Sequence, residues 1–239
     1  MNKDTITIIT VNLNGSAYLE RTICSVLDQV GAEVEYILVD GGSDDGSEKI
    51  ISTYKDQIDK VIMACGLNRP MAINEGLKRA TGDWVSWLDS GDVLQPDAFD
   101  GLLDRDEQWI AGAAVIVDNR DEPLSKIISE TPASQASHLM RDSGIIAPGG
   151  SLWRRSLLTD HGVLDTGLAH AAEYEWHCRL LSLGILPTVV NRTIVSLRET
   201  QAASAQATLQ FGEELIHVAE RICSRSVAGR SDDGQAEPG

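Results

Sequence analysis

The alternation of strand-like and helix-like segments over residues 5–88 is the feature that most constrains the fold. Thr5–Val11 is β-branched throughout and Glu35–Val39 is a second strand-like run, as expected for strands buried on both faces. Between them, apolar residues recur at helical spacing over Ala17–Val30. The alternation continues with a helix, a strand, a helix and a strand over Glu48–Tyr54, Lys60–Met63, Asn68–Ala80 and Trp84–Leu88. This order predicts an α/β fold with a mostly parallel central sheet flanked by helices.

The pattern is less regular after Pro96. It predicts helices at Ala98–Leu103, Arg154–Thr159, Tyr174–Leu183 and Ala202–Arg225, and extended segments at Trp109–Val117, Ile185–Val190 and Ile194–Leu197. Ser134–Ile146 has no readable period. Because the sequence contains no repeat or linker, we expect residues 1–225 to form a single domain. The polar, Gly-rich residues 226–239 are expected to form a disordered tail.

The formal net charge of −16 disfavours two classes of partner. Nonspecific binding to nucleic acid needs a basic surface, and so does adsorption to an anionic membrane. We therefore expect no nucleic-acid partner. A substrate that carries phosphate would need a metal ion or a local group of cations to overcome the field of the whole chain.

Several features are typical of a cytoplasmic protein. No apolar run approaches the roughly 20 residues that span a bilayer, and the start of the sequence lacks the pattern of a signal peptide. The four cysteines are scattered without zinc-like spacing, which is typical of reduced thiols. We expect a cytoplasmic location and no transmembrane segment.

Small polar residues follow three of the predicted strands. They are Thr10 and Asn12, Asp40 and Ser43, and Asp89 and Asp92. Ligands bind at the carboxyl ends of strands in open α/β sheets, so this recurrence favours a nucleotide, with a divalent cation at the last pair. Each pair alone is also compatible with ordinary turn chemistry. The GxGxxG and P-loop spacings are both missing, which argues against a nicotinamide, flavin or P-loop enzyme.

Longer segments around these residues resemble a known family. IITVNLNGSAYLERTICSVLDQ, EYILVDGGSDDGS and AINEGLKRATGDWVSWLDSGD follow one another as in glycosyltransferase family 2, the inverting enzymes of GT-A fold. The resemblance covers roughly residues 5–100, and GGSLWRRSLL and AAEYEWHCRLLSLG add a weaker similarity. It implies a nucleotide-sugar-binding half at about 1–100 and an acceptor half at about 101–225.

The resemblance also implies roles for individual residues. A nucleoside-diphosphate sugar would be bound by Thr10, Asn12, Asp40, Ser43, Arg69, Asn74 and Asp89. The cofactor would be Mn²⁺ or Mg²⁺, held by Asp92, with Asp89 on the ion, on a metal-bound water or on the ribose.

The sequence departs from the family pattern in three places. Gly91 stands where the usual metal-binding motif has an acidic residue. The stretch CGLNRPM lacks the carboxylates that the family often has before AINEG, although Arg69 in it could meet a phosphate. Pro148 and Gly149 stand where the family often has His-Gln, so the acceptor side is divergent.

The catalytic base is expected at the start of a late helix, where the family has an acidic residue. AAEYEWHCRL offers Glu173 and Glu175. Two residues apart on a helix, they project about 200° apart, so one of them can face a cleft. Alignment with the family selects Glu173. Both could instead be first-turn acids that complement the helix dipole.

These features predict an inverting, metal-dependent glycosyltransferase. It would transfer a sugar to a glycan or lipid-linked acceptor, in cell-envelope or exopolysaccharide synthesis, with membrane association through a partner. The altered motifs leave open a GT-A scaffold that has lost turnover and acts as a nucleotide- or glycan-binding regulatory module. A nucleotidyltransferase is a third alternative, but the Gly-rich Arg/Lys loop that such enzymes have after the first strand is missing.

Overall fold

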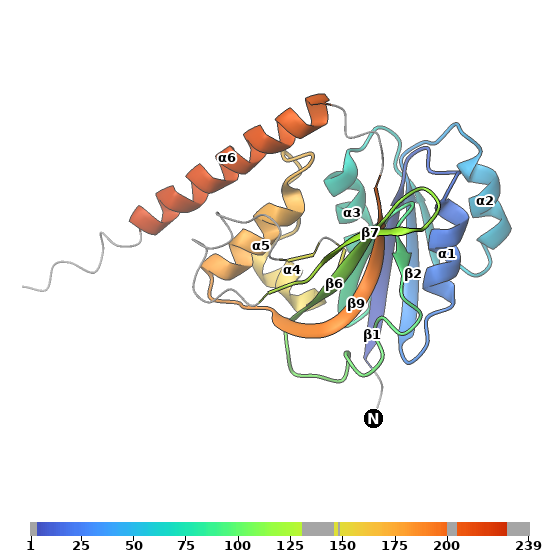
Figure 1. Cartoon of the computed structure of the whole chain (residues 1–239), viewed down its shortest axis with the longest axis horizontal. Helices are drawn as coiled ribbons and strands as arrows, with labels where there is room; N and C mark the ends of the chain where they lie inside the picture. The colour runs from blue at the N-terminus through green and yellow to red at the C-terminus, as the bar shows by residue number, and fades with distance from the viewer. Residues whose placement is uncertain (1–3, 131–145, 148, 200–204, 229–239) are drawn as a thin grey trace, which may run out of the picture.

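The computed structural model describes residues 4–130, 146–147, 149–199 and 205–228. Within these residues, nine strands form one sheet. The strands are β1 Thr5–Asn12, β2 Glu33–Asp40, β3 Lys60–Met63, β4 Trp84–Asp89, β5 Val93–Leu94, β6 Trp109–Val117, β7 Pro123–Ile127, β8 Ser151–Arg154 and β9 Thr188–Arg198. The helices are α1 Leu19–Leu27, α2 Ser47–Tyr54, α3 Arg69–Leu77, α4 Arg155–His161, α5 Ala172–Ser182 and α6 Ala205–Ala228. Helices α1 to α5 lie around the sheet, and α6 extends away from it beyond α5 (Figure 1).

The N-terminal half of the sheet is parallel. Its order is β3-β2-β1-β4, and each neighbouring pair runs in the same direction, as the strand–helix alternation predicts. The order then continues through β8, β6 and β9 to β5, and β7 pairs with β6. In this second half β6 and β9 run parallel, whereas β8, β5 and β7 are antiparallel to their partners. The sheet is therefore mixed, with a parallel half that provides a common carboxyl edge.

Helices cover both faces of the sheet. The helices α1 and α2 lie on one face, and α3, α4 and α5 lie on the other (Figure 1). Neighbouring residues of β1 point to opposite faces. Ile8 packs in the hydrophobic core under α1 and α2, and Ile9 packs in the core under α3, α4 and α5, and both are fully buried. This arrangement explains why β1 is buried along almost its whole length, with β-branched residues on both faces, instead of alternating between buried and exposed residues.

The second half of the chain differs in part from the pattern-based expectation. Ala98–Leu103 forms consecutive turns instead of a helix, and the Ala98 and Leu102 N–H groups bond to carbonyls three residues back. The two expected extended segments after residue 184 belong to the single strand β9. The strands β5 and β8, of 2 and 4 residues, are too short to show a period in the sequence.

Two expectations concern residues that the structure describes only in part. Most of Ser134–Ile146 lies outside the described residues. The helix α6 ends at Ala228, inside the segment expected to be a disordered tail, and residues 229–239 again lie outside the described ranges. Among the helices that are described, none is both long and apolar enough to cross a membrane.

Candidate active site

The register of the parallel strands brings three polar strand ends to one edge of the sheet. Asn12 of β1 is paired with Asp40 of β2, and Val11 is paired with Asp89 of β4. The carboxyl ends of these three strands therefore lie side by side. This is the edge at which ligands of open α/β sheets bind.

Asn12, Asp40 and Ser43 form a hydrogen-bonded group at this edge. The Asn12 amide donates to Asp40 Oδ2 over 2.6 Å and to Ser43 Oγ over 3.0 Å. Asp40 Oδ1 accepts from the N–H groups of Gly42 and Ser43 at 2.9 and 2.8 Å. Burial alone would raise the pKa of Asp40, but the hydrogen bonds from Ser43, Asn12 and Gly42 outweigh burial and lower it. Asp40 is therefore a buried, ionised acceptor at the carboxyl end of β2.

Arg69 connects two acidic residues from distant parts of the chain. It is the first residue of α3, which is capped by Asn68. Arg69 Nε lies 2.7 and 2.9 Å from the two carboxylate oxygens of Asp89, and Arg69 Nη2 lies 3.5 Å from Glu173 Oε2. Burial would lower the pKa of Arg69, but the charges of Asp89 and Glu173 outweigh burial and raise it. A permanently charged guanidinium thus lies between two acids.

Glu173 is held on the wall of a cavity. Its side chain, in the first turn of α5, is 11% exposed. The Trp87 indole N–H donates to Glu173 Oε2 over 3.2 Å, and the Gly149 N–H donates to Oε1 over 3.3 Å. The cavity has a volume of about 330 Å³, and Arg69, Asp89 and Glu173 line it together with residues of α5 and α6. The Glu173 carboxylate, the Arg69 guanidinium and the Asp89 carboxylate at the end of β4 thus line a single cavity.

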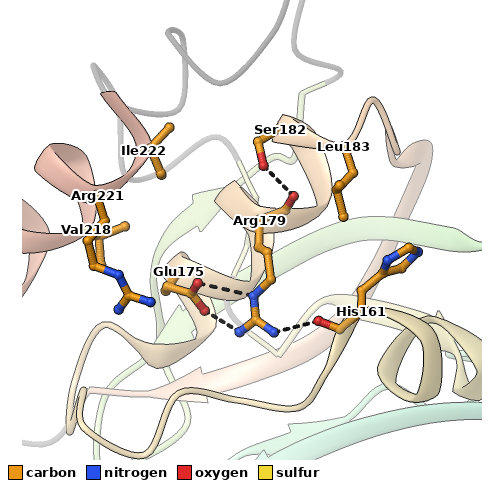
Figure 2. Close-up of a pocket in the computed structure, with 8 residues that line it drawn as sticks. All are labelled: His161, Glu175, Arg179, Ser182, Leu183, Val218, Arg221 and Ile222. Atoms are coloured by element: carbon orange, nitrogen blue, oxygen red, sulfur yellow. Dashed lines mark hydrogen bonds and ion pairs between the residues drawn. The ribbon is translucent and has the colours of Figure 1, made fainter. Parts of the chain in front are cut away.

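Glu175 faces a different cavity. It is paired with Arg179, whose Nε lies 3.1 Å from Glu175 Oε1, and both line a second cavity of about 410 Å³ between α5 and α6. Figure 2 shows this ion pair and the bond from Arg179 to the His161 carbonyl oxygen, with Val218 of α6 nearby. Here the guanidinium links α5 to the end of α4. Of the two acids in AAEYEW, Glu173 is therefore the one that lies beside Arg69.

The loop after β4 is held in place by Arg198, the last residue of β9. The Arg198 backbone N–H donates to Asp92 Oδ1 over 3.0 Å, and its Nε donates to the Gly91 carbonyl oxygen over 3.2 Å. Gly91 has a φ of +121°, a conformation that residues with a side chain rarely adopt. An acidic residue at this position would be strained, so the departure from the family pattern has a backbone reason.

Asp89 and Asp92 were expected to hold a divalent cation. Burial and the negative charge of Asp89 raise the pKa of Asp92 to about 7, although the Arg198 N–H and Arg69 act in the opposite direction. Oxygen ligands whose charges repel one another are the kind of site that Mg²⁺ or Mn²⁺ stabilises, so this pair fits the ion by donor chemistry. Within the described residues, no group of three or more His, Cys, Asp or Glu side chains could hold a metal by itself. Phosphate oxygens or water would have to complete the coordination.

Of the residues expected to bind the donor or the metal, Arg69 and Asp89 line this cavity. The others do not line it: Thr10, Asn12, Asp40, Ser43, Asn74 and Asp92. Thr10 is fully buried, and its hydroxyl accepts from the Tyr36 hydroxyl over 3.0 Å. The Asn74 side chain donates to the Leu164 carbonyl oxygen over 2.9 Å and accepts from the Leu164 N–H over 3.2 Å. In this structure both side chains use their polar atoms within the protein, and their contacts with a donor stay predictions.

The sequence does not indicate which groups hold Glu173. Trp87 of β4 is fully buried, but the contact of its indole N–H with a residue 86 positions away has no sequence signal. Gly149 belongs to the segment that departs from the family pattern, yet it supplies a backbone donor. Contacts of this kind arise only when β4, α5 and the segment before β8 are packed together.

Similarity to known proteins was found in sequence and in structure. An uncharacterized glycosyltransferase of Nostoc sp. is 30% identical over 156 residues, which are 62% of this chain and 47% of that protein. The succinoglycan biosynthesis protein ExoO of Rhizobium meliloti is 33% identical over 118 residues, 48% of this chain and 33% of that protein. The chain thus spans less than half the length of these two relatives.

A solved structure establishes the fold, and a family model establishes the family. The mannosyltransferase PcManGT from Pyrobaculum calidifontis, solved with GDP-Man and Mn²⁺, matches with a TM-score of 0.62 and 17% identity, over 100% of this chain and 67% of that one. At this identity the likeness concerns the fold alone, which is GT-A. The model described as glycosyl transferase family 2 matches residues 7–160, more than half of the chain. The chain therefore belongs to glycosyl transferase family 2.

Proposed function

We propose that this chain is an inverting, metal-dependent glycosyltransferase. It would move a sugar from a nucleoside-diphosphate sugar to a hydroxyl of a glycan or lipid-linked acceptor, in cell-envelope or exopolysaccharide synthesis. The observation that carries the proposal is the cluster of Arg69, Asp89 and Glu173 on one cavity at the carboxyl edge of the sheet. The relative named for succinoglycan biosynthesis and the mannosyltransferase solved with GDP-Man and Mn²⁺ support this substrate class.

Three groups would bind the donor. The ionised Asp40, held by Asn12 and Ser43, would accept a hydrogen bond from the base. Asp92 and Asp89 would hold Mn²⁺ or Mg²⁺, which supplies positive charge against the diphosphate leaving group. Arg69 could exchange Asp89 for a phosphate oxygen, because a guanidinium binds carboxylate and phosphate through the same pair of N–H groups.

Glu173 would act as the general base. As the acceptor oxygen bonds to the anomeric carbon, its proton passes to the Glu173 carboxylate, and the bond from that carbon to the diphosphate oxygen breaks. The nucleoside diphosphate leaves with the bonding electrons, so a single displacement inverts the anomeric carbon. The N–H groups of Trp87 and Gly149 hold the carboxylate in one orientation while it accepts the proton.

The place of action would follow from the acceptor. A lipid-linked acceptor would require work at the cytoplasmic face of a membrane. Because the net charge of −16 is repelled by an anionic surface, a partner protein would have to provide the contact.

A second candidate function is a nucleotide- or glycan-binding module without turnover. The ion pair between Asp89 and Arg69 favours it, because this pair engages one of the two carboxylates that would otherwise face a metal. The two functions differ in their dependence on metal. A module would bind nucleotide equally well with and without the ion.

Purified protein with Mn²⁺ or Mg²⁺ and a panel of nucleotide sugars tests the proposal. Release of nucleoside diphosphate from at least one donor is expected, faster when the acceptor is present. Calorimetric titration of UDP and GDP should show tighter binding with Mn²⁺, and Asp92→Ala should abolish that gain. Folded protein that neither binds nor turns over any donor would contradict the glycosyltransferase, and metal-independent binding without turnover would favour the module.

A further inference from the structure

The buried residue Glu214, on α6, binds the start of α5. It accepts three consecutive backbone N–H groups, from Ala169 at 3.0 Å, and from His170 and Ala171 at 2.8 Å each. Glu214 is 8% exposed, and these bonds outweigh the effect of burial and lower the pKa of its carboxyl. An ionised carboxylate therefore lies at the amino end of a helix that belongs to another part of the chain.

The start of α5 needs such a partner. The first N–H groups of a helix have no acceptor within the helix, and a side chain before the helix usually supplies one. Here the N-cap is Ala171, which makes no side-chain hydrogen bond, and the residues on either side of it are His170 and Ala172. The Glu214 carboxylate accepts the N–H of the N-cap residue Ala171 and of the two residues before it, so it holds the chain where it enters α5 and complements the positive end of the helix dipole.

The same helix start forms part of the cavity. His170 precedes it and Glu173 lies in its first turn, and both line the cavity with Arg69 and Asp89. Phe211 of α6, one turn before Glu214, lines the same cavity. Figure 1 shows α6 lying against α5 and extending away from the sheet. The match to the family model ends at residue 160, so α5 and α6 both lie outside the matched region.

We propose that Glu214 is a positioning residue for sugar transfer. By holding the backbone at the start of α5, it fixes the direction in which the Glu173 side chain points into the cavity. This inference rests on the proposed role of Glu173 as the base. Glu214 itself touches no reacting atom. Its bonds to residues 169–171 fix the backbone immediately before Glu173, and the Trp87 and Gly149 donors fix the carboxylate at the other end of the side chain. Loss of either restraint lets the carboxylate move out of line with the acceptor hydroxyl.

The test compares Glu214→Ala and Glu214→Gln with Glu213→Ala in the full chain. Glu213 is the exposed neighbour on α6 and serves as the matched control. Hydrogen exchange followed by mass spectrometry should show the amides of residues 169–171 exchanging about tenfold faster in Glu214→Ala, because each has lost its acceptor. Glu214→Gln, which keeps one amide oxygen, should lie between Glu214→Ala and the wild type. Glu213→Ala should match the wild type.

Activity gives the second readout. With a donor that the wild type turns over, kcat of Glu214→Ala should fall about 10- to 100-fold while the donor KM stays constant, because misplacement of a catalytic group slows the chemical step. Glu214→Gln should recover part of the loss. A wild-type kcat in Glu214→Ala despite faster exchange would overturn the inference, as would an equal loss in Glu213→Ala. If the wild type turns over no donor, the proposed function is wrong, and the positioning role that rests on it is wrong too. The exchange rates of residues 169–171 report separately on whether Glu214 binds the entry into α5.

Discussion

At the scale of single residues, the proposed chemistry depends most on Glu173, the expected general base. Donors from three separate segments reach its carboxylate: the guanidinium of Arg69, the indole of Trp87 and the backbone of Gly149. These contacts hold the Glu173 carboxylate in one orientation on the cavity wall, beside the positive charge of Arg69. Glu175, two residues further along, is used instead in the ion pair with Arg179.

Glu173→Gln should lower kcat by about 10²- to 10⁴-fold, because an amide cannot take the proton of the acceptor hydroxyl. Binding of UDP or GDP with Mn²⁺, measured by calorimetry, should not change, because the donor contacts lie at the strand ends. Glu175→Gln is the matched control. It should destabilise the fold, because it leaves Arg179 without its charge partner, while kcat stays close to that of the wild type. Comparable kcat losses in the two variants would argue against Glu173 as the base.

Substitutions at Gly91 test whether backbone geometry explains why glycine stands where the family motif has an acidic residue. Its φ of +121° should make Gly91→Ala and Gly91→Asp less stable by about 1–3 kcal/mol, measured by urea unfolding. The Cβ itself would have room, since its nearest neighbour, an Arg198 carbon, would be 3.7 Å away, so the cost is conformational. If Gly91→Asp were as stable as the wild type and bound Mn²⁺ more tightly, the backbone explanation would be wrong.

At the scale of elements, the close packing of α3 on β1 decides where Arg69 stands. Gly76 lies in α3, and a Cβ there would come within 2.6 Å of Ile9 Cγ2 on β1. The helix therefore approaches the sheet more closely than a larger residue would allow. This approach places the amino end of α3, with Arg69, next to Asp89 at the end of β4.

Gly76→Ala should destabilise the protein by about 1–3 kcal/mol, because the added methyl group forces Ile9 or the helix to shift. The control is Gly212→Ala in α6, where a Cβ would meet no atom of the described residues within 4 Å. This second change should raise stability by up to about 1 kcal/mol, because alanine is the better helix former. Thermal and urea unfolding of both variants measure the difference. A neutral Gly76→Ala would mean that α3 does not pack as closely as described.

At the scale of the whole molecule, acid sensitivity should follow from buried carboxylates, of which Glu35 is the clearest. Glu35 lies toward the amino ends of the parallel strands, away from the candidate site. It accepts from the Thr7 hydroxyl of β1 and from the Thr81 N–H before β4, and it pairs with Lys60 of β3. Burial would raise the pKa of Glu35, but the bonds from Lys60, Thr7 and Thr81 lower it from 4.5 to about 2. One carboxylate thus connects β1, β2 and β3 with the segment before β4.

Because the folded pKa of Glu35 lies below its unfolded value, its contribution to stability is present above pH 4.5 and is lost as the pH falls toward 2. The contribution at pH 7 is of the order of 2–3 kcal/mol. Glu35→Gln should therefore be less stable than the wild type at pH 7, and the gap should narrow between pH 4.5 and 2. Urea midpoints at several pH values measure it, with the exposed Glu48→Gln as the control. A gap that does not change with pH would contradict the assignment.

Much of the fold can be predicted from the sequence because the signal is local. Strands of β-branched residues such as Thr5–Val11, separated by amphipathic helices, permit few arrangements other than a parallel sheet with helices on both faces. The strand ends that carry Asn12, Asp40 and Asp89 could be named for the same reason, since parallel strands place their carboxyl ends together. The short strands β5 and β8 could not, because segments of 2 and 4 residues carry no period.

The sequence by itself thus determined the α/β architecture, the family and the set of polar residues at the strand ends. Only the tertiary structure decided which of these residues share a cavity, because contacts across 86 or 104 positions, such as those of Glu173 with Trp87 and Arg69, depend on how elements pack. It also decided that Thr10 and Asn74 bond within the protein and that Glu214 of α6 binds the backbone at the entry into α5. Periodicity along a chain is a local property, whereas a site is a meeting of side chains from distant segments.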